Sequence, residues 1–182
     1  MTLPTNFKCA RFEDDKDTAI VRQLEKDVDA ARFDTPEGKI ELPVKLKVYD
    51  SVFVPLAKWA MLLAGNYRCV TEDGMRTAQE AVHTDLATSK SVYDFVFDLC
   101  VKLGANPADL VPFEKYAAAA QSLVRPASAA RALQNGAPNI ERADKLVQLI
   151  AKQKGLSHPA IDAQVALVDE RIAANRKKAA AA

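Results

Sequence analysis

Apolar residues with helical spacing run through the middle of the chain, between residues 77 and 104. Steps of four and three residues place one set on a single face: Val82, Leu86, Ser89, Tyr93, Val96, Cys100 and Leu103. Val92, Phe95 and Leu99 form a second stripe beside it, so the later part of the segment is apolar around most of its circumference. Helices of this kind are typically buried on most sides. We therefore predict one long buried helix, ending at Gly104, that the rest of the chain covers.

Weaker helical patterns flank this segment. They predict helices at residues 14–33, 51–65, 108–121, 128–133, 139–155 and 157–178. We expect inward-facing apolar residues in two of them: Ile20, Val21, Leu24 and Val28 in the first, and Leu146, Leu149 and Ile150 in the fifth. Short connections between such helices are typical of a compact helical domain.

The segment at residues 39–49 alternates between apolar and polar side chains, which is typical of a half-buried strand. Its apolar positions are Ile40, Leu42, Val44, Leu46 and Val48. Pro43 interrupts the alternation and predicts an edge or a bulge. A single strand cannot stand alone, so three alternatives are open: a small hairpin, an extended run across helices, or pairing with another chain. In the last case the five apolar positions form a partner-strand edge.

These patterns predict a mainly α fold of six to eight helices with a short extended segment near residues 39–49. We assign residues 1–13 to an irregular N-terminal arm, residues 14–178 to a single helical domain and residues 179–182 to an alanine tail. With 182 residues, 49% of them hydrophobic, the chain is large enough to form a core without disulfides. Its three cysteines are far apart in sequence, which is typical of reduced thiols.

Charges are balanced: 25 Lys and Arg stand against 24 Asp and Glu, a formal net charge of +1. This balance argues against broad non-specific binding to nucleic acid or acidic membranes. A weak cluster of cations supplies the candidate nucleic-acid contacts: Lys45, Lys47, Lys58 and Arg68. The N-terminus lacks the apolar run of a secretory signal, and no stretch reaches the roughly 18 apolar residues that span a bilayer. We expect a soluble, intracellular protein without a membrane partner.

Candidate catalytic and metal-binding residues are few. Glu80 and His83 have the Glu-x-x-His spacing of di-iron helix bundles, but those sites need the motif twice, and the other histidine, His158, has no such partner. Neither histidine has a nucleophile-elbow or Gly-rich partner, and Cys100 is typical of a small core residue. No phosphate-binding glycine motif occurs. We therefore predict no catalytic residues, no metal and no cofactor, and a protein that is not an enzyme.

One pattern begins after residue 52. Asn66 follows Lys58 by eight residues, and Ser128 stands shortly before the sequence RALQNGAP. This arrangement resembles the helical C-terminal domain of ketopantoate reductases, whose active site includes a lysine, asparagines and a serine. The resemblance implies a substrate or dimerisation domain with Lys58, Asn66 and Ser128 in one pocket. Leu62 occupies the position of the family's first asparagine, Glu141 is offset by one residue, and the nucleotide-binding domain has no counterpart.

A second pattern begins at residue 42. The basic strand LPVKLKVY is followed by FVPLAKWAMLLAG and then by a long helix, ATSKSVYDFVFDLCVKLG. This order resembles coat proteins of rod-shaped plant viruses, and the resemblance implies that Arg68 lies near RNA-contacting arginines. The Phe-Asp pair that the family carries after its second helix is missing here.

We infer a non-enzymatic structural or assembly subunit as the leading function, with itself or other protein subunits as partners. The lack of a catalytic set, the extended segment and the mixed-charge surface support this hypothesis. An RNA-packaging coat protein and a ketopantoate-reductase-like helical domain are the alternatives.

Overall fold

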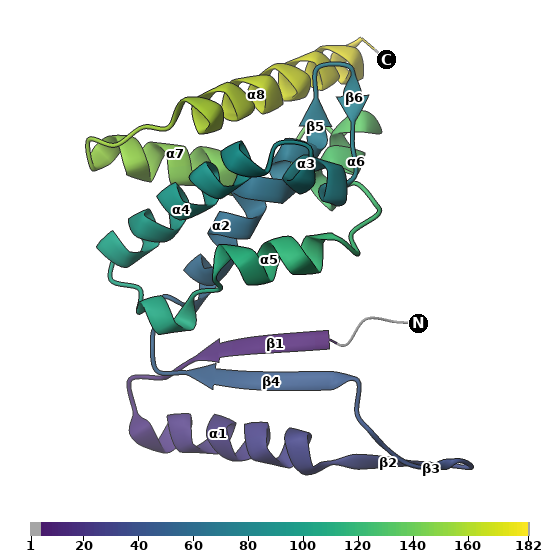
Figure 1. The fold of residues 1–182 in the computed structure, drawn as a ribbon, viewed down its shortest axis with the longest axis vertical. Helices are drawn as coiled ribbons and strands as arrows, with labels where there is room; N and C mark the ends of the chain where they lie inside the picture. The colour runs from purple at the N-terminus through teal and green to yellow at the C-terminus, as the bar shows by residue number, and fades with distance from the viewer. Residues whose placement is uncertain (1–4, 182) are drawn as a thin grey trace. The chain divides into compact units, whose positions relative to one another are not determined.

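The computed structural model describes residues 5–181, and within this range it contains eight α-helices and six short strands (Figure 1). The predicted mainly α fold of six to eight helices is confirmed. The structure divides into two compact units, and one boundary between them lies within residues 14–178, which the sequence assigned to one helical domain. Unit 1 comprises residues up to Pro55 together with Ala105–Asp109, and unit 2 comprises Leu56–Gly104 and the chain from Leu110 onward.

Unit 1 is built on two parallel strands, β1 (Thr5–Ala10) and β4 (Val44–Tyr49). Phe7 lies opposite Leu46 and Cys9 lies opposite Val48. The connection between these strands contains α1 (Asp15–Ala30), β2 (Arg32–Thr35) and β3 (Gly38–Glu41). The N-terminal arm expected to be irregular thus contains a strand, because its partner lies far along the sequence; residues 1–4 are outside the described range.

The extended segment is paired within the chain: its first part belongs to a small hairpin, one of the three alternatives, and its second part pairs with β1. β3 pairs antiparallel with β2, which places Ile40 opposite Phe33, while Val44, Leu46 and Val48 belong to β4. Leu42 lies in the stretch of chain that connects β3 to β4. The switch of partners occurs beside Pro43, which has no N–H to donate to a continuous ladder.

Unit 2 is helical around a long central helix, α4 (Leu86–Lys102). A helical run from residue 54 to 69 precedes it; this run includes α2 (Trp59–Met61) and, at Leu62–Asn66, one π-helical turn. The hairpin β5 (Val70–Thr71) and β6 (Gly74–Met75) follows, and then α3 (Ala78–His83). The remaining helices are α5 (Phe113–Ala120), α6 (Ser128–Gln134), α7 (Ala143–Gln153) and α8 (Pro159–Ala180).

The predicted central helix is present but is broken once, between α3 and α4. Asp85 caps the start of α4, because its carboxylate accepts a hydrogen bond from the Thr88 N–H at 2.9 Å. The expected inward face is largely confirmed, since α4 buries Ser89, Val92, Tyr93, Val96, Leu99 and Cys100. Leu86, at the start of the helix, is exposed. α4 packs against α2, α3, α5 and α8.

Two helices are rotated relative to the prediction. In α1, Val21 and Val28 are half-buried as expected, but Ile20 and Leu24 are exposed. In α7, Leu146 and Leu149 are exposed, whereas Asp144 and Gln148 are buried. Which face of each helix is buried depends on polar contacts with neighbouring elements. Helical periodicity alone does not reveal these contacts.

Gly65 leaves no room for a side chain. A Cβ atom at this position would lie 1.9 Å from the Tyr116 hydroxyl oxygen and 3.3 Å from a Val82 methyl group. We expect Gly65→Ala to lower the free energy of unfolding by about 1–3 kcal/mol, because the added methyl group would overpack the core. Chemical denaturation measures this change. Adding Tyr116→Phe removes the clashing oxygen and should recover part of the loss; a Gly65→Ala variant as stable as the wild type would contradict the packing.

Candidate functional site

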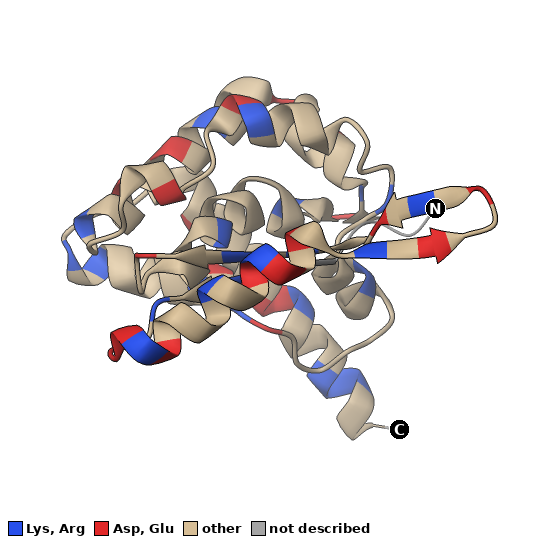
Figure 2. Cartoon of the chain, turned by 90° about the horizontal axis from the view of Figure 1, so that it is seen from below, with Lys and Arg blue, Asp and Glu red and all other residues tan. Residues whose placement is uncertain are grey.

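The predicted nucleic-acid contacts do not form a free basic surface. Lys45 and Lys47 point outward from β4, and both are paired with acids: Lys45 with Asp29 at 3.2 Å, and Lys47 with Glu25 at 3.3 Å. Lys45 also lies 3.7 Å from Glu41. Figure 2 shows the same interleaving of acidic and basic residues along most of the chain. The positive charge of this strand is therefore largely neutralised by α1 and β3.

Arg68 and Lys58 have different surroundings from the β4 lysines. Arg68 is buried, with 9% of its surface exposed, and its Nη1 donates to the Ser89 hydroxyl at 2.6 Å. Burial, together with the nearby Arg76, lowers the pKa of the Arg68 guanidinium. Lys58 is exposed and, among residues 5–181, has no carboxylate within ion-pair distance. Of the four predicted contacts, Lys45 and Lys47 lie in unit 1, and Lys58 and Arg68 lie in unit 2.

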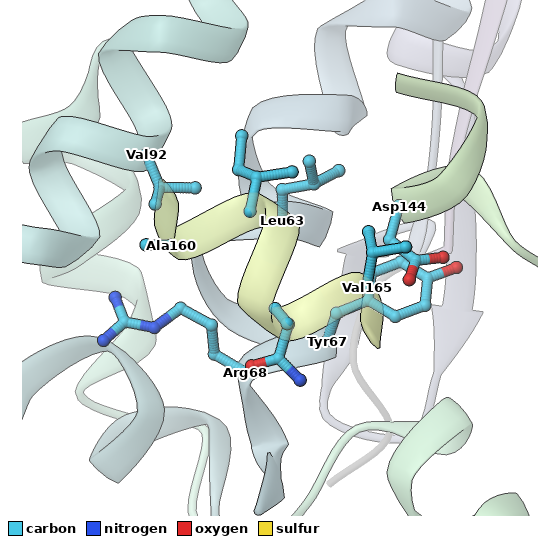
Figure 3. Close-up of a pocket in the computed structure, with 9 residues that line it drawn as sticks. Leu63, Tyr67, Arg68, Val92, Asp144, Ala160 and Val165 are labelled. Atoms are coloured by element: carbon cyan, nitrogen blue, oxygen red, sulfur yellow. The ribbon is translucent and has the colours of Figure 1, made fainter. Parts of the chain in front are cut away.

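Tyr67 is the centre of a buried polar network in unit 2 (Figure 3). Its hydroxyl donates to the Glu141 carbonyl at 2.7 Å and accepts from the Ala143 N–H at 2.9 Å. Burial, followed by the charge of Asp144, raises the pKa of Tyr67 to about 12. This hydroxyl therefore stays protonated at neutral pH and fixes the start of α7, where the first N–H groups lack helical partners.

Asp144, next to this network, is buried and receives a two-pronged hydrogen bond from Arg142. The Nε–Oδ1 and Nη2–Oδ2 distances are 2.8 and 3.0 Å. Arg142 also reaches Asp169 on α8, which pairs with Lys145 as well. A buried carboxylate requires such partners, because an unpaired charge in the interior is very costly. The arrangement thus locks α7 onto α8.

The small cavity in Figure 3 separates Arg68 from the Asp144 side of the network. Leu63, Val92 and Val165 form part of its apolar wall. Its volume is about 10 Å³, which is the space of one water molecule. A space of this size cannot admit a substrate, so this cavity is not a substrate site.

A larger hollow of about 300 Å³ lies on another side of Tyr67. Its polar lining comes from residues at the end of the π-helical turn, the start of α6 and the segment before α7: Asn66, Ser128, Asn139 and Glu141. Leu62 and Ile140 contribute apolar surface. The ketopantoate-reductase resemblance predicted that Asn66 and Ser128 lie together, and the structure places both here with Glu141 and Leu62. Lys58 is not among the lining residues.

One pair of side chains with chemically reactive groups was not predicted from the sequence. The Ser91 hydroxyl lies 3.0 Å from His158 Nε2, although the residues are 67 positions apart. His158 Nδ1 is buried without a hydrogen-bond partner among the described residues, and burial lowers the pKa of the imidazole. Ser91 sits within α4, where backbone N–H groups bond within the helix and cannot stabilise an oxyanion. No sequence signal connects these two positions.

The Glu80 and His83 pair has structural partners. Glu80 completes the capping box of α3 with Thr77, and His83 Nε2 lies 3.0 Å from the Ala117 carbonyl. Within the described part of the chain, no group of three or more potential metal ligands comes together. None of the helices at residues 5–181 combines the length and the apolar character needed to cross a bilayer.

The chain matches no protein-family model, and comparisons with curated proteins and with solved structures find no significant similarity. The two resemblances therefore stay predictions that depend on the residues quoted for them.

The Tyr67 hydroxyl offers a direct test of the buried network. We expect Tyr67→Phe to lower the free energy of unfolding by about 1–3 kcal/mol, because it leaves the buried Ala143 N–H without an acceptor. Tyr93→Phe is the matched control: this buried hydroxyl only donates, to the Val111 carbonyl, so its loss should cost less, about 1 kcal/mol. Equal losses in urea denaturation would show that the Ala143 contact is unimportant.

Proposed function

We propose that the protein is a structural subunit that assembles with other protein chains. The observation that carries the proposal is the incomplete core of unit 1. Seven of its large apolar side chains are exposed: Phe7, Phe12, Ile20, Leu24, Phe33, Ile40 and Val52. In β4 and α1, the fully buried positions are Val48 and Thr18.

A sheet of two parallel strands requires further cover to be stable. Parallel sheets are normally buried on both faces, and two-stranded sheets are marginal in water. The hairpin β2–β3 adds to the exposed apolar surface, because Phe33 and Ile40 face each other across it and are 59% and 49% exposed. In Figure 1 this hairpin extends beyond the end of α1.

The exposed aromatic area of unit 1 is a fraction of what a standard protein interface uses. A Phe side chain buries about 150–250 Å² when it is fully covered, so three half-exposed Phe residues offer roughly 300 Å². A standard interface buries about 800 Å² on each partner. The aromatic residues of unit 1 alone would thus supply a large share, and the aliphatic residues would add to it. The ion-paired lysines of β4 favour a protein partner over a nucleic acid.

The hollow lined by Asn66, Ser128 and Glu141 supports a second candidate function, binding of a small polar ligand. Concave sites with a few converging polar groups are the usual form of such sites. The ketopantoate-reductase resemblance points to the same residues. This function is compatible with assembly, because the hollow lies in unit 2 and the incomplete core lies in unit 1.

The assembly proposal predicts particles larger than one chain. Light scattering after size exclusion should give a mass above 19.8 kDa that rises with protein concentration, because exposed apolar surface is buried on association. Absorbance at 260 and 280 nm on the same sample identifies nucleic acid. A monodisperse monomer at high concentration, with no co-purifying protein, would contradict assembly; large particles with excess absorbance at 260 nm would favour the RNA coat protein.

The ligand proposal predicts binding that depends on Ser128. With ketopantoate as the probe, titration calorimetry should detect an affinity that Ser128→Ala weakens about tenfold, the usual effect of one lost hydrogen bond. Ser122→Ala is the control, because Ser122 is exposed but lies outside the hollow. Absence of binding to the wild type, or equal affinity in both variants, would argue against this use of the hollow.

A further inference from the structure

Two helices, one in each unit, expose a pair of large aliphatic residues. On α1, Ile20 and Leu24 are 67% and 50% exposed. On α7, Leu146 and Leu149 are 48% and 50% exposed. Residues three or four positions apart are neighbours on a helix surface, so each pair forms a short apolar ridge of the kind that packs into the groove of another helix.

α7 buries Ala143, Val147 and Ala151 together with two polar residues, Asp144 and Gln148, and it leaves Leu146 and Leu149 exposed. Asp144 is held by Arg142, and the Gln148 amide donates to Asp162 of α8. These contacts turn the helix so that Leu146 and Leu149 face away from the core. Exposed leucines beside a buried carboxylate are a local conflict between apolar pattern and packing, and natural sequences keep such conflicts mainly at functional sites.

Charges around the two ridges differ in sign. On α1, Asp17, Ile20, Leu24 and Asp27 follow one another in steps of three, four and three, so an acid lies at each end of the ridge. Lys16 also neighbours Ile20.

On α7, Lys145, Leu149 and Lys152 follow one another in steps of four and three, so cations flank the ridge. Both lysines also pair with α8, with Asp169 and Asp162, which reduces their local charge. The charge next to the α7 ridge is therefore largely neutralised, and the positive charge that α1 would meet is that of unit 2 as a whole.

The net charges of the two units are also opposite in sign. Unit 1 carries nine Lys and Arg against twelve Asp and Glu, whereas unit 2 carries sixteen against twelve. Opposite charges favour the encounter of unit 1 from one chain with unit 2 from another. An acidic unit 1 would also be repelled by nucleic acid and by anionic lipid.

We propose that α1 of one copy packs on α7 of a second copy, with Ile20 and Leu24 against Leu146 and Leu149. The proposal rests on the assembly function proposed above and names its partner, another molecule of this chain. Self-pairing of α1 would bring Asp17 and Asp27 of two copies together, whereas pairing with α7 places this acidic ridge against unit 2, which carries the excess of cations. The mixed pairing brings opposite charges together, so the contact is head-to-tail.

A head-to-tail contact uses two different surfaces of each molecule, so every added copy leaves one surface free. Such contacts build rings when the rotation closes and open filaments when it does not. A single ridge-to-ridge contact is small by the standards of stable interfaces, so the assembly should grow with concentration and dissociate on dilution.

Two double variants test the proposal by complementation. The α1 variant is Ile20→Gln with Leu24→Gln, and the α7 variant is Leu146→Gln with Leu149→Gln; glutamine is a good helix former and suits exposed positions. Light scattering at matched concentrations should show each variant as a monomer. An equimolar mixture should give a dimer of twice 19.8 kDa, because one intact α1 and one intact α7 remain. Val124→Gln, at a site 65% exposed outside both ridges, should assemble like the wild type.

The outcomes separate this contact from assembly in general. Wild-type assembly that either double variant retains alone would overturn the α1–α7 contact and leave the assembly function standing, as would a mixture of folded monomeric variants that fails to dimerise. A wild type that is monomeric at all concentrations would overturn both. Far-UV circular dichroism confirms that the variants are folded.

Discussion

Burial of α4 is the constraint on which unit 2 depends. A helix that is apolar around most of its circumference must be covered on most sides, and α2, α3, α5 and α8 provide this cover. The hydroxyl of Ser89 on its inner face donates to the Val82 carbonyl at 2.8 Å and accepts from the Arg68 guanidinium. Arg68 is therefore buried beside Ser89, where its guanidinium donates a hydrogen bond to the hydroxyl.

Unit 1 has no comparable element. Its helix meets the sheet largely through ion pairs: Glu25 and Asp29 of α1 bind Lys47 and Lys45 of β4, and Arg22 binds Asp50. Exposed ion pairs contribute little to stability, commonly below 1 kcal/mol each. Ion pairs of this kind fix the position of α1 but contribute little to the stability of unit 1. The exposed apolar residues of α1, Ile20 and Leu24, stay available for packing.

The sequence predicted what local periodicity determines. The inward face of α4 and the extended stretch around β4 follow from residues close together in the chain. The parallel pairing of β1 with β4 does not, because it joins segments more than thirty residues apart. The orientation of α7 also failed, since Asp144 is buried in an ion pair with Arg142 that helical periodicity does not reveal. The hollow around Asn66 and Ser128 was reached through the family resemblance, whereas the Ser91–His158 pair has no local signal.

The path of the chain between the units has a genetic consequence. Unit 1 is completed by Ala105–Asp109, which follow α4 of unit 2, so the boundary between the units is crossed more than once. No single cut in the polypeptide separates them, and a deletion of the first 55 residues would leave the short segment after α4 without the rest of its unit. Exchange of the first 55 residues alone would therefore not transfer the whole of unit 1.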